Sequence, residues 1–212
     1  MLAVSVMNDF FKLFVDNLQA TTLLEGIAVL TGLMSVWYAR KAHILVYPTG
    51  IISVLLYVFI CFGAKLYADM GINGFYFAMS VYGWYMWTRK DAHRELRRVQ
   101  YCSRTGHLIS LAGAVAFFLL IRYVLIHYTD SNVPNWDALT TAIFIIAMWL
   151  MALKKVEHWA WWILGDLISI PLYFSKALVL TSFQYTAFLI LAIMGYVEWV
   201  KIVRRNNQAA SA

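Results

Sequence analysis

Seven long apolar stretches alternate with shorter polar segments along the chain. A helix needs about 20 mostly apolar residues to cross the hydrocarbon core of a bilayer, and each stretch comes close to that length. The strands of a membrane barrel would alternate apolar and polar residues, whereas these runs are continuous. The pattern therefore predicts seven transmembrane helices, at about residues 20–38, 43–63, 67–88, 107–127, 137–153, 158–178 and 181–201.

The longest polar linker separates the first three predicted helices from the fourth. It reads TRKDAHRELRRVQYCSRTG (Thr88–Gly106) and is basic. We therefore expect six segments: an N-terminal extracytoplasmic segment at 1–19, a three-helix unit at 20–88, a basic cytoplasmic loop at 89–106, a linker helix with an outer loop at 107–136, a second three-helix unit at 137–203 and a cytoplasmic tail at 204–212.

The distribution of basic residues predicts the orientation. Thirteen of the 17 Lys and Arg residues fall after the first, third, fifth and seventh predicted helices, which with seven spans is one side of the membrane. Short loops on the cytoplasmic side of membrane proteins are enriched in Lys and Arg. The C-terminus should therefore be cytoplasmic and the N-terminus outside.

Composition supports a membrane protein and narrows its partners. Hydrophobic residues make up 62% of the chain and charged residues 13%, whereas a soluble domain carries about a quarter charged residues. The formal net charge of +6 sets orientation in such a chain, so we expect the bilayer as a partner and no nucleic acid. The oligomeric state is left open, a homo-oligomer included.

The two three-helix units resemble each other weakly. Gly83 and Trp87 end the third predicted helix as Gly195 and Trp199 end the seventh, each pair four residues apart. Further matches pair His43 and Gly50 with His158 and Gly165, and place Asn73 near Gln184. With one helix between the units, both would have the same orientation in the membrane. Parallel repeats of this kind occur in secondary transporters, whose substrate lies near midplane at the repeat interface.

Charged residues inside a membrane span are costly and are usually functional or paired. Asp166 lies about eight residues into the sixth predicted span and has a side chain too short to reach the interface. Glu198 is expected to be interfacial, and the role of Glu25 is left open. Asn73 and Gln184 lie at similar depth, either as ligands of a solute or as hydrogen-bonding contacts between helices.

Asp166 shares a helix face with two tryptophans. In HWAWWILGD, Trp159, Trp162 and Asp166 follow an i, i+3, i+7 spacing, which places them on one side of a helix. An aromatic face attracts a delocalised cation by about 0.5–2 kcal/mol, and a carboxylate accepts hydrogen bonds from hydroxyls. Pro171 further along would kink the helix beside a cavity. The face suits a flat, cationic aromatic solute with a polar appendage.

Other functions of seven-helix proteins lack their required residues. A retinal protein needs a lysine in the middle of its last helix, and 181–200 contains none. A membrane-embedded enzyme would need a nucleophile with a base, or paired acids, and neither GxSxG nor HExxH occurs. A receptor or scaffold without transport activity stays an alternative. We expect no enzyme activity, no cofactor and no metal site.

The motif W-x-x-W-x-x-x-D formed by Trp159, Trp162 and Asp166 resembles the signature of the PnuC-type vitamin transporters, whose last position is Asn or Asp. Three further stretches are similar to the family: the end region Ile170–Trp199, which includes Tyr185, and in the first half Tyr47–Phe59 and Tyr82–Trp87. The resemblance covers roughly residues 20 to 203.

The resemblance implies import of nicotinamide riboside, an NAD precursor, across the bacterial inner (plasma) membrane. Transport would be facilitated diffusion, with trapping by a cytoplasmic kinase. The implied fold is an all-α integral membrane protein whose seven helices form a 3+1+3 parallel repeat, as in SWEET sugar transporters, with the N-terminus outside and the C-terminus inside.

The resemblance also implies a binding site. Trp159 and Trp162 would flank the pyridinium ring, and Asp166 would hold ribose hydroxyls. Many nicotinamide riboside members have Asn where this chain has Asp, and related members carry thiamine, so thiamine stays an alternative solute. The expected substrate-binding residues are Trp159, Trp162, Asp166, Asn73, Gln184 and Tyr185.

Overall fold

The structure is a computed structural model that describes residues 22–63, 67–90, 98–176 and 178–211. The described residues form seven helices: α2 (Leu23–Arg40), α3 (Val46–Gly63), α4 (Tyr67–Thr88), α5 (Arg104–Tyr128), α6 (Pro134–Ala152), α7 (His158–Ser175) and α8 (Val179–Ser211). Each overlaps one of the seven predicted stretches, so the all-α prediction is confirmed, and α8 continues ten residues past the predicted end at 201 into the predicted tail. The predicted N-terminal segment and residues 91–97 of the predicted basic loop lie outside the described residues.

By length and hydropathy, four helices qualify as membrane spans: α3, α5, α6 and α8. The other three have a lower mean hydropathy over a span-length window, and α7 shows where their polar residues can lie. His158 and Asp166 of α7 are buried inside the bundle, where neighbouring helices shield them from lipid. The polar residues therefore lower the hydropathy of α7 without facing the bilayer.

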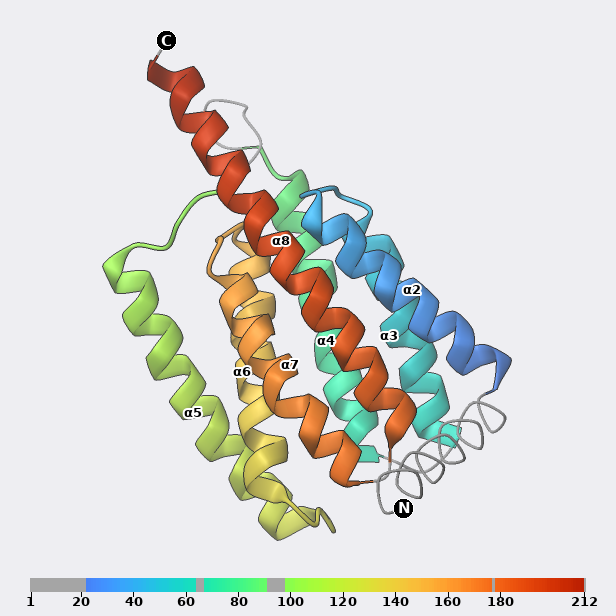
Figure 1. Ribbon diagram of the computed structural model, residues 1–212. Helices are drawn as coiled ribbons and strands as arrows, with labels where there is room; N and C mark the ends of the chain where they lie inside the picture. Colours follow the sequence, from blue (N-terminus) through green and yellow to red (C-terminus); the bar gives the residue numbers. More distant parts are fainter. Residues whose placement is uncertain (1–21, 64–66, 91–97, 177, 212) are drawn as a thin grey trace, which may run out of the picture.

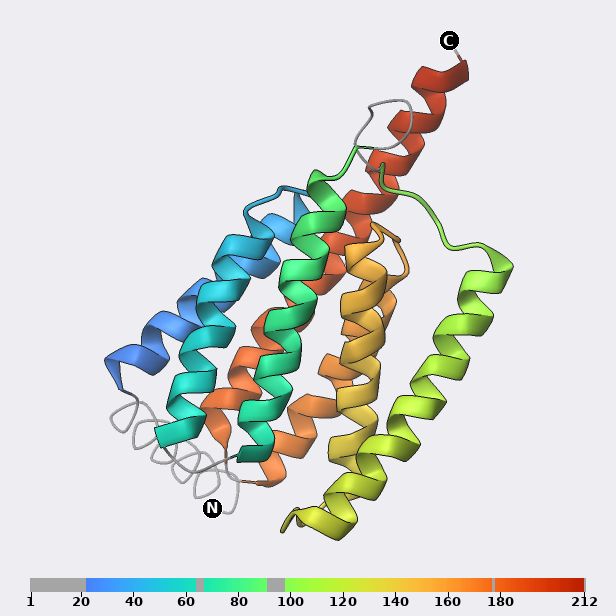
Figure 2. The same cartoon turned by 180° about the vertical axis from the view of Figure 1, so that it is seen from behind.

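Six of the helices form a closed ring. Among the described helices, each member packs against two neighbours in the order α2, α3, α4, α6, α7 and α8, and α8 closes the ring on α2. Helix α5 lies outside the ring and packs on α6 alone, as Figures 1 and 2 show. We call α2–α4 the first unit and α6–α8 the second unit. The third helix of each unit thus contacts the first helix of the other.

Helix α2 begins with a capping box, which settles the role of Glu25. The Glu25 carboxylate accepts the backbone N–H of Thr22 at 2.6 Å, and the Thr22 hydroxyl accepts the N–H of Glu25 at 3.3 Å. Two of the free donors at the helix start are satisfied in this way. Glu25 therefore defines the end of a helix and is not a buried functional acid.

Small residues bring α2 and α3 into close contact. Ser35 of α2 lies against Gly50 of α3, and Ser53 of α3 lies against Gly32 of α2, where added Cβ atoms would be 2.9 and 3.0 Å from the hydroxyl oxygens. Each hydroxyl also donates to a backbone carbonyl of the other helix at 2.7 Å. Small and hydroxyl residues of this kind are a common means of packing helices in membranes.

The turns that join the first and second helices of the two units have the same conformation. Ala42 and Lys154 both have a positive φ, 51° and 52°. Their neighbours His43 and Lys155 donate to equivalent carbonyls in the preceding helix at 3.0 and 2.9 Å. The hydrogen bonds therefore pair His43 with Lys155, and the sequence match between His43 and His158 is wrong.

Both turns lie at the end of the bundle that carries most of the described basic residues. We call this end, which includes Arg40, Lys41, Arg89, Lys154 and Lys155, the basic end; α8 continues past it in Figure 1. The chain that enters α5 is attached there: Gln100 donates to the carbonyl of Lys154 and accepts from the N–H of Val156, both at 3.1 Å. The Cys102 N–H donates to the Glu157 carboxylate at 2.9 Å.

The buried core that connects the ring lies at the same end. Its members come from all six ring helices, from the segment before α5 and from the turn between α6 and α7: Ala39, Val46, Tyr47, Trp87, Val99, Met151, Val156, Trp159, Ala192, Trp199 and Val203. Large aromatic rings therefore fill the centre of the ring at the basic end.

Candidate functional site

A cavity of about 390 Å³ lies inside the ring. This volume is within the range of sites for small organic ligands. All six ring helices contribute to its wall, and α5 contributes nothing among the described residues. The six residues predicted from the sequence all line it: Trp159, Trp162, Asp166, Asn73, Gln184 and Tyr185. The structure thus brings together residues from α4, α7 and α8 that lie up to 112 positions apart.

Helix α7 supplies the wall that the sequence motif predicted. Trp159, Trp162 and Asp166 all line the cavity, as their spacing on one helix face requires. Trp159 is fully buried, with its ring against Gly195 of α8, whereas Trp162 is half-buried. Pro171 lies inside α7 and removes the hydrogen bond to the carbonyl of Leu167. Figures 1 and 2 show α7 bending along its length.

Asp166 dominates the electrostatics of the cavity. Its side chain is 1% exposed, and neither carboxylate oxygen has a hydrogen-bond partner among the described residues. It is also the only acidic or basic side chain among the described residues that line the cavity. A buried anion without a partner is costly, so the site favours a solute that brings hydrogen-bond donors or positive charge.

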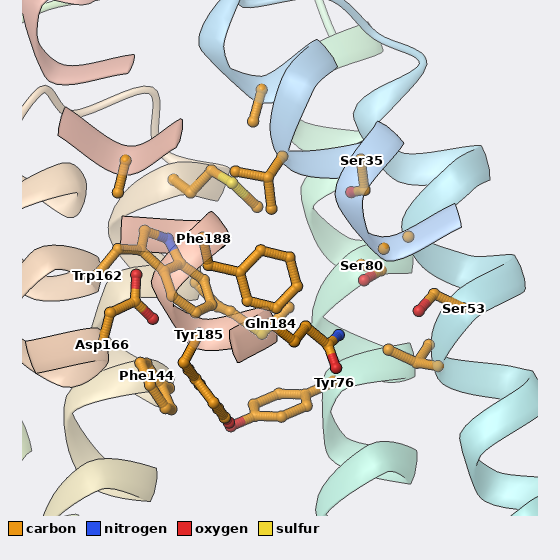
Figure 3. A pocket seen from close by; sticks show the side chains of 18 of the residues that line it. Ser35, Ser53, Tyr76, Ser80, Phe144, Trp162, Asp166, Gln184, Tyr185 and Phe188 are labelled. Atoms are coloured by element: carbon orange, nitrogen blue, oxygen red, sulfur yellow. The ribbon is translucent and has the colours of Figure 1, made fainter. Parts of the chain in front are cut away.

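Aromatic rings stack beside Asp166 in a column that Figure 3 shows in part. Phe144 of α6 stacks on Trp162, with ring centroids 5.1 Å apart and planes at 28°. Tyr185 stacks on the Phe144 ring at 6.0 Å and on the ring of Tyr173 at 5.1 Å. The column gives the cavity a flat aromatic surface within reach of the carboxylate.

The opposite wall is polar and uncharged. Figure 3 shows Trp162 and Asp166 on one side of the cavity and Ser53 and Ser80 on the other, with Gln184 between them. The Gln184 side chain is hydrogen-bonded to the Tyr57 hydroxyl. Hydroxyl and amide groups of this kind orient a polar solute without adding charge.

Several residues of the site could not be recognised from the sequence. Phe144 lies in the continuous apolar run of α6, where nothing distinguishes it from its neighbours. Its role depends on Gly165 of α7, because a side chain at that position would collide with the Phe144 ring. Tyr47 of α3 is buried in the cavity wall and was recognised only as part of the family resemblance. Only helix–helix packing identifies these residues.

The groups on the cavity wall indicate the kind of solute that it can bind. The described residues contain no group of three or more His, Cys, Asp or Glu that could hold a metal ion. The wall offers one carboxylate, a flat aromatic surface and several hydroxyl and amide groups. These groups match a flat aromatic cation with hydroxyl substituents.

Comparisons with known proteins match the chain to a family of transporters. The family described as "Nicotinamide mononucleotide transporter" matches residues 22–201. A "Nicotinamide riboside transporter PnuC" of Neisseria mucosa is 28% identical, with 87% of this chain and 74% of that protein covered. The protein of the same description from Escherichia coli is 26% identical, with 88% and 89% covered.

Two further relatives extend the comparison. A "Riboflavin/roseoflavin transporter RibM" of Streptomyces davaonensis is 27% identical, with 84% of each chain covered. A solved structure titled "Crystal structure of the Vitamin B3 transporter PnuC" superposes with a TM-score of 0.71 at 27% identity, over 96% of this chain and 92% of that one. All of these relatives are named as transporters.

Proposed function

The chain belongs to the nicotinamide mononucleotide transporter family, and from this premise we propose that it imports nicotinamide riboside by facilitated diffusion. It is a multi-pass protein of the bacterial inner membrane and a transporter rather than an enzyme. Relatives from two genera are named as nicotinamide riboside transporters. A cytoplasmic kinase would trap the imported vitamin by phosphorylation, as the family resemblance implies.

Asp166 is the observation that favours the riboside over the mononucleotide. A phosphate group would bring about two negative charges next to a buried carboxylate, in a cavity with no Lys, Arg or His among its described lining residues. The riboside lacks that phosphate and carries a positive pyridinium ring. Its charge complements Asp166, whereas the mononucleotide would be repelled.

The six lining residues support one arrangement of the solute. The pyridinium ring would lie against the Trp162 ring, where the aromatic face attracts a cation. The ribose hydroxyls would donate to Asp166, whose oxygens have no described partner. Asn73, Gln184 and Tyr185 would complete the polar contacts from α4 and α8.

The packing order of the helices supports a 3+1+3 parallel repeat. Within each unit the middle helix packs on the other two, and the third helix of each unit packs on the first helix of the other. Ala42 and Lys154 occupy equivalent turns, and the number of positions between them in the sequence equals that between Gly83 and Gly195. Helix α5 would then be the linker that gives both units the same orientation.

Orientation follows from the basic end. Short basic loops stay on the cytoplasmic side, so we place the basic end, and with it the C-terminus, in the cytoplasm. This requires the N-terminus to be outside. A C-terminal tag accessible to protease in inverted but not in right-side-out vesicles is the expected result.

Thiamine is the second candidate solute, because it also carries a flat positive ring and Asp166 stands where many nicotinamide riboside transporters have Asn. The experiment is calorimetric titration of the purified protein with nicotinamide riboside, nicotinamide mononucleotide and thiamine in parallel. Binding of the riboside alone is expected. Binding of thiamine alone would overturn the proposed substrate, and mononucleotide binding as tight as that of the riboside would contradict the role of Asp166.

A further inference from the structure

Two buried tryptophans close the cavity toward the basic end. The indole N–H of Trp87, near the end of α4, donates to the carbonyl of Met151 in α6 at 3.0 Å. The indole N–H of Trp199 in α8 donates to the carbonyl of Ala39 in α2 at 2.9 Å. Each bond therefore runs from the third helix of one unit to the end of the first helix of the other.

The two contacts share their hydrogen-bonding geometry, although His158 packs on the Trp199 ring alone and Lys154 lies over the Trp87 ring alone. Trp199 follows Trp87 by the same interval that separates Met151 from Ala39. Both acceptor carbonyls also accept a second N–H at 2.9 Å, from Ala42 and from Lys154, the two residues of positive φ. The indoles thus bind the same kind of turn in each unit.

The rings around the two indoles repeat the same arrangement. Tyr47 packs edge-on against Trp87, with centroids 5.1 Å apart and planes at 88°, and Trp159 packs edge-on against Trp199 at 5.9 Å and 89°. Tyr47 in turn lies against Gly83, and Trp159 against Gly195. The Trp87 and Trp199 rings meet in the middle at 6.1 Å, where the two units join.

This cluster lies across the path that a solute would take out of the cavity. Tyr47, Trp159, Ala39 and Met151 belong both to the cavity lining and to the buried core of the basic end. Trp87 and Trp199 are buried behind them, at 3% and 0% exposure. A solute bound near Asp166 can reach the basic end only if these rings separate.

Resting on the proposed function and orientation, we propose that Trp87 and Trp199 are paired latches that hold the cytoplasmic end of the transport path closed between the two units. Releasing a latch costs one hydrogen bond and leaves the carbonyl satisfied by the N–H of its own turn. The units can then separate as rigid bodies, which is how repeat transporters alternate access. Trp159 lines the cavity and also packs on Trp199. A solute that contacts the Trp159 ring would therefore contact a direct neighbour of the Trp199 latch.

The test measures access to the cavity from the cytoplasmic side. Ser80 of α4 lines the cavity and is buried, so Ser80→Cys is the reporter, in a background with Cys61→Ala and Cys102→Ala. A membrane-impermeant thiol reagent is applied to the cytoplasmic face of inverted vesicles. Phenylalanine at positions 87 and 199 keeps one aromatic ring, and removes the N–H donor together with the second ring of the indole. Trp84→Phe, on the exposed face of the same helix, is the matched control.

The double variant Trp87→Phe with Trp199→Phe should label about tenfold faster than the parent, because two buried hydrogen bonds to the closed state are lost. Each single variant should label faster than the control and more slowly than the double variant. If the double variant does not fold, the two single variants are compared with the control instead. A rate equal to the parent, a rise in only one single variant, or a rise seen only from the outer face would overturn the proposal. Labelling needs no vitamin, so its result does not depend on the substrate. The proposed function is tested separately, by titration of the parent protein with nicotinamide riboside.

Discussion

At the residue scale, the site depends on two side chains of α7 with opposite properties. Asp166 is a buried acid without a described partner, whereas Trp162 is half-buried and stacked on Phe144. The carboxylate makes the empty site unfavourable, and the ring makes a flat cation favourable in its place. In the proposed site, binding energy and selectivity for charge would therefore come from neighbouring positions on one helix face.

The Trp162 ring should contribute directly to affinity. Trp162→Ala removes the aromatic face and is expected to weaken binding of nicotinamide riboside by about 1 kcal/mol or more, which is fivefold or more in Kd. Calorimetric titration measures the change. Trp161→Ala is the control, because Trp161 is adjacent in sequence and is absent from the described cavity wall. Unchanged affinity in Trp162→Ala would assign the ring to the membrane interface instead.

At the scale of elements, glycines set the spacing between α3 and α4 and between α7 and α8. The Tyr47 ring lies against Gly83, and the Trp159 ring lies against Gly195. A methyl group at either glycine would occupy the position of a ring that is itself fully buried. These two helix pairs therefore tolerate no larger residue at the contact.

Gly83→Ala and Gly195→Ala should each destabilise the protein by about 1–3 kcal/mol through overpacking. The measurement is thermal unfolding of the purified protein in detergent. Gly74→Ala in α4 is the control, since nothing lies within 4 Å of a Cβ added there. That variant should be neutral or slightly stabilising, because alanine favours helix. Equal unfolding temperatures for all three variants would show that the glycine contacts do not limit the helix spacing.

A second feature at this scale is the attachment of the segment before α5 to the turn between α6 and α7. Cys102 donates its backbone N–H to the Glu157 carboxylate. Burial first, and then the negative charge of Glu157, raise the pKa of the Cys102 thiol, while Lys155 lowers it. The thiol is therefore less reactive at neutral pH than an isolated cysteine, since the thiolate is the nucleophile.

Glu157→Gln should lower the pKa of the Cys102 thiol, because it removes the negative charge and keeps a hydrogen-bond acceptor. The rate of alkylation below the thiol pKa should then rise, and the whole rate–pH profile should move to lower pH. The measurement uses a Cys61→Ala background so that a single thiol is followed. Glu198→Gln, which removes a charge near Lys201 instead, should leave the profile unchanged. An unshifted rate–pH profile in Glu157→Gln would show that the Glu157 charge does not affect the pKa of the Cys102 thiol.

At the scale of the whole molecule, a closed ring of six helices surrounds one cavity, and the ring is filled with aromatic residues at the basic end. Asp166 is the only charged residue in the described cavity wall, so no series of acids or histidines is available there to relay protons. A ring made of two similar units, closed at one end, is suited to alternating access by movement of one unit against the other.

Transport should run only down the gradient of the solute. In liposomes that contain the purified protein, labelled nicotinamide riboside is expected to reach the outside concentration and no higher. Imposed proton or sodium gradients should not change that plateau. Liposomes without protein provide the control for leakage. Accumulation above the outside concentration under either ion gradient would contradict facilitated diffusion.

The sequence by itself determined the features that depend on one helix at a time. Continuous apolar runs fixed seven helices, because spanning a bilayer requires about 20 apolar residues in a row. The spacing of Trp159, Trp162 and Asp166 placed them on one face, because the helix repeat is regular. The matching Gly and Trp pairs of α4 and α8, Gly83 with Trp87 and Gly195 with Trp199, were visible for the same reason.

Only the tertiary structure decided what those faces meet. Phe144 lies in a uniform apolar run, and nothing local shows that it stacks on Trp162 across α6 and α7. The acceptors of the Trp87 and Trp199 N–H groups are backbone carbonyls 64 and 160 positions away. Every residue has a backbone carbonyl, so sequence cannot distinguish these two from the rest. They become partners because the third helix of each unit packs on the first helix of the other, which is a property of the closed ring.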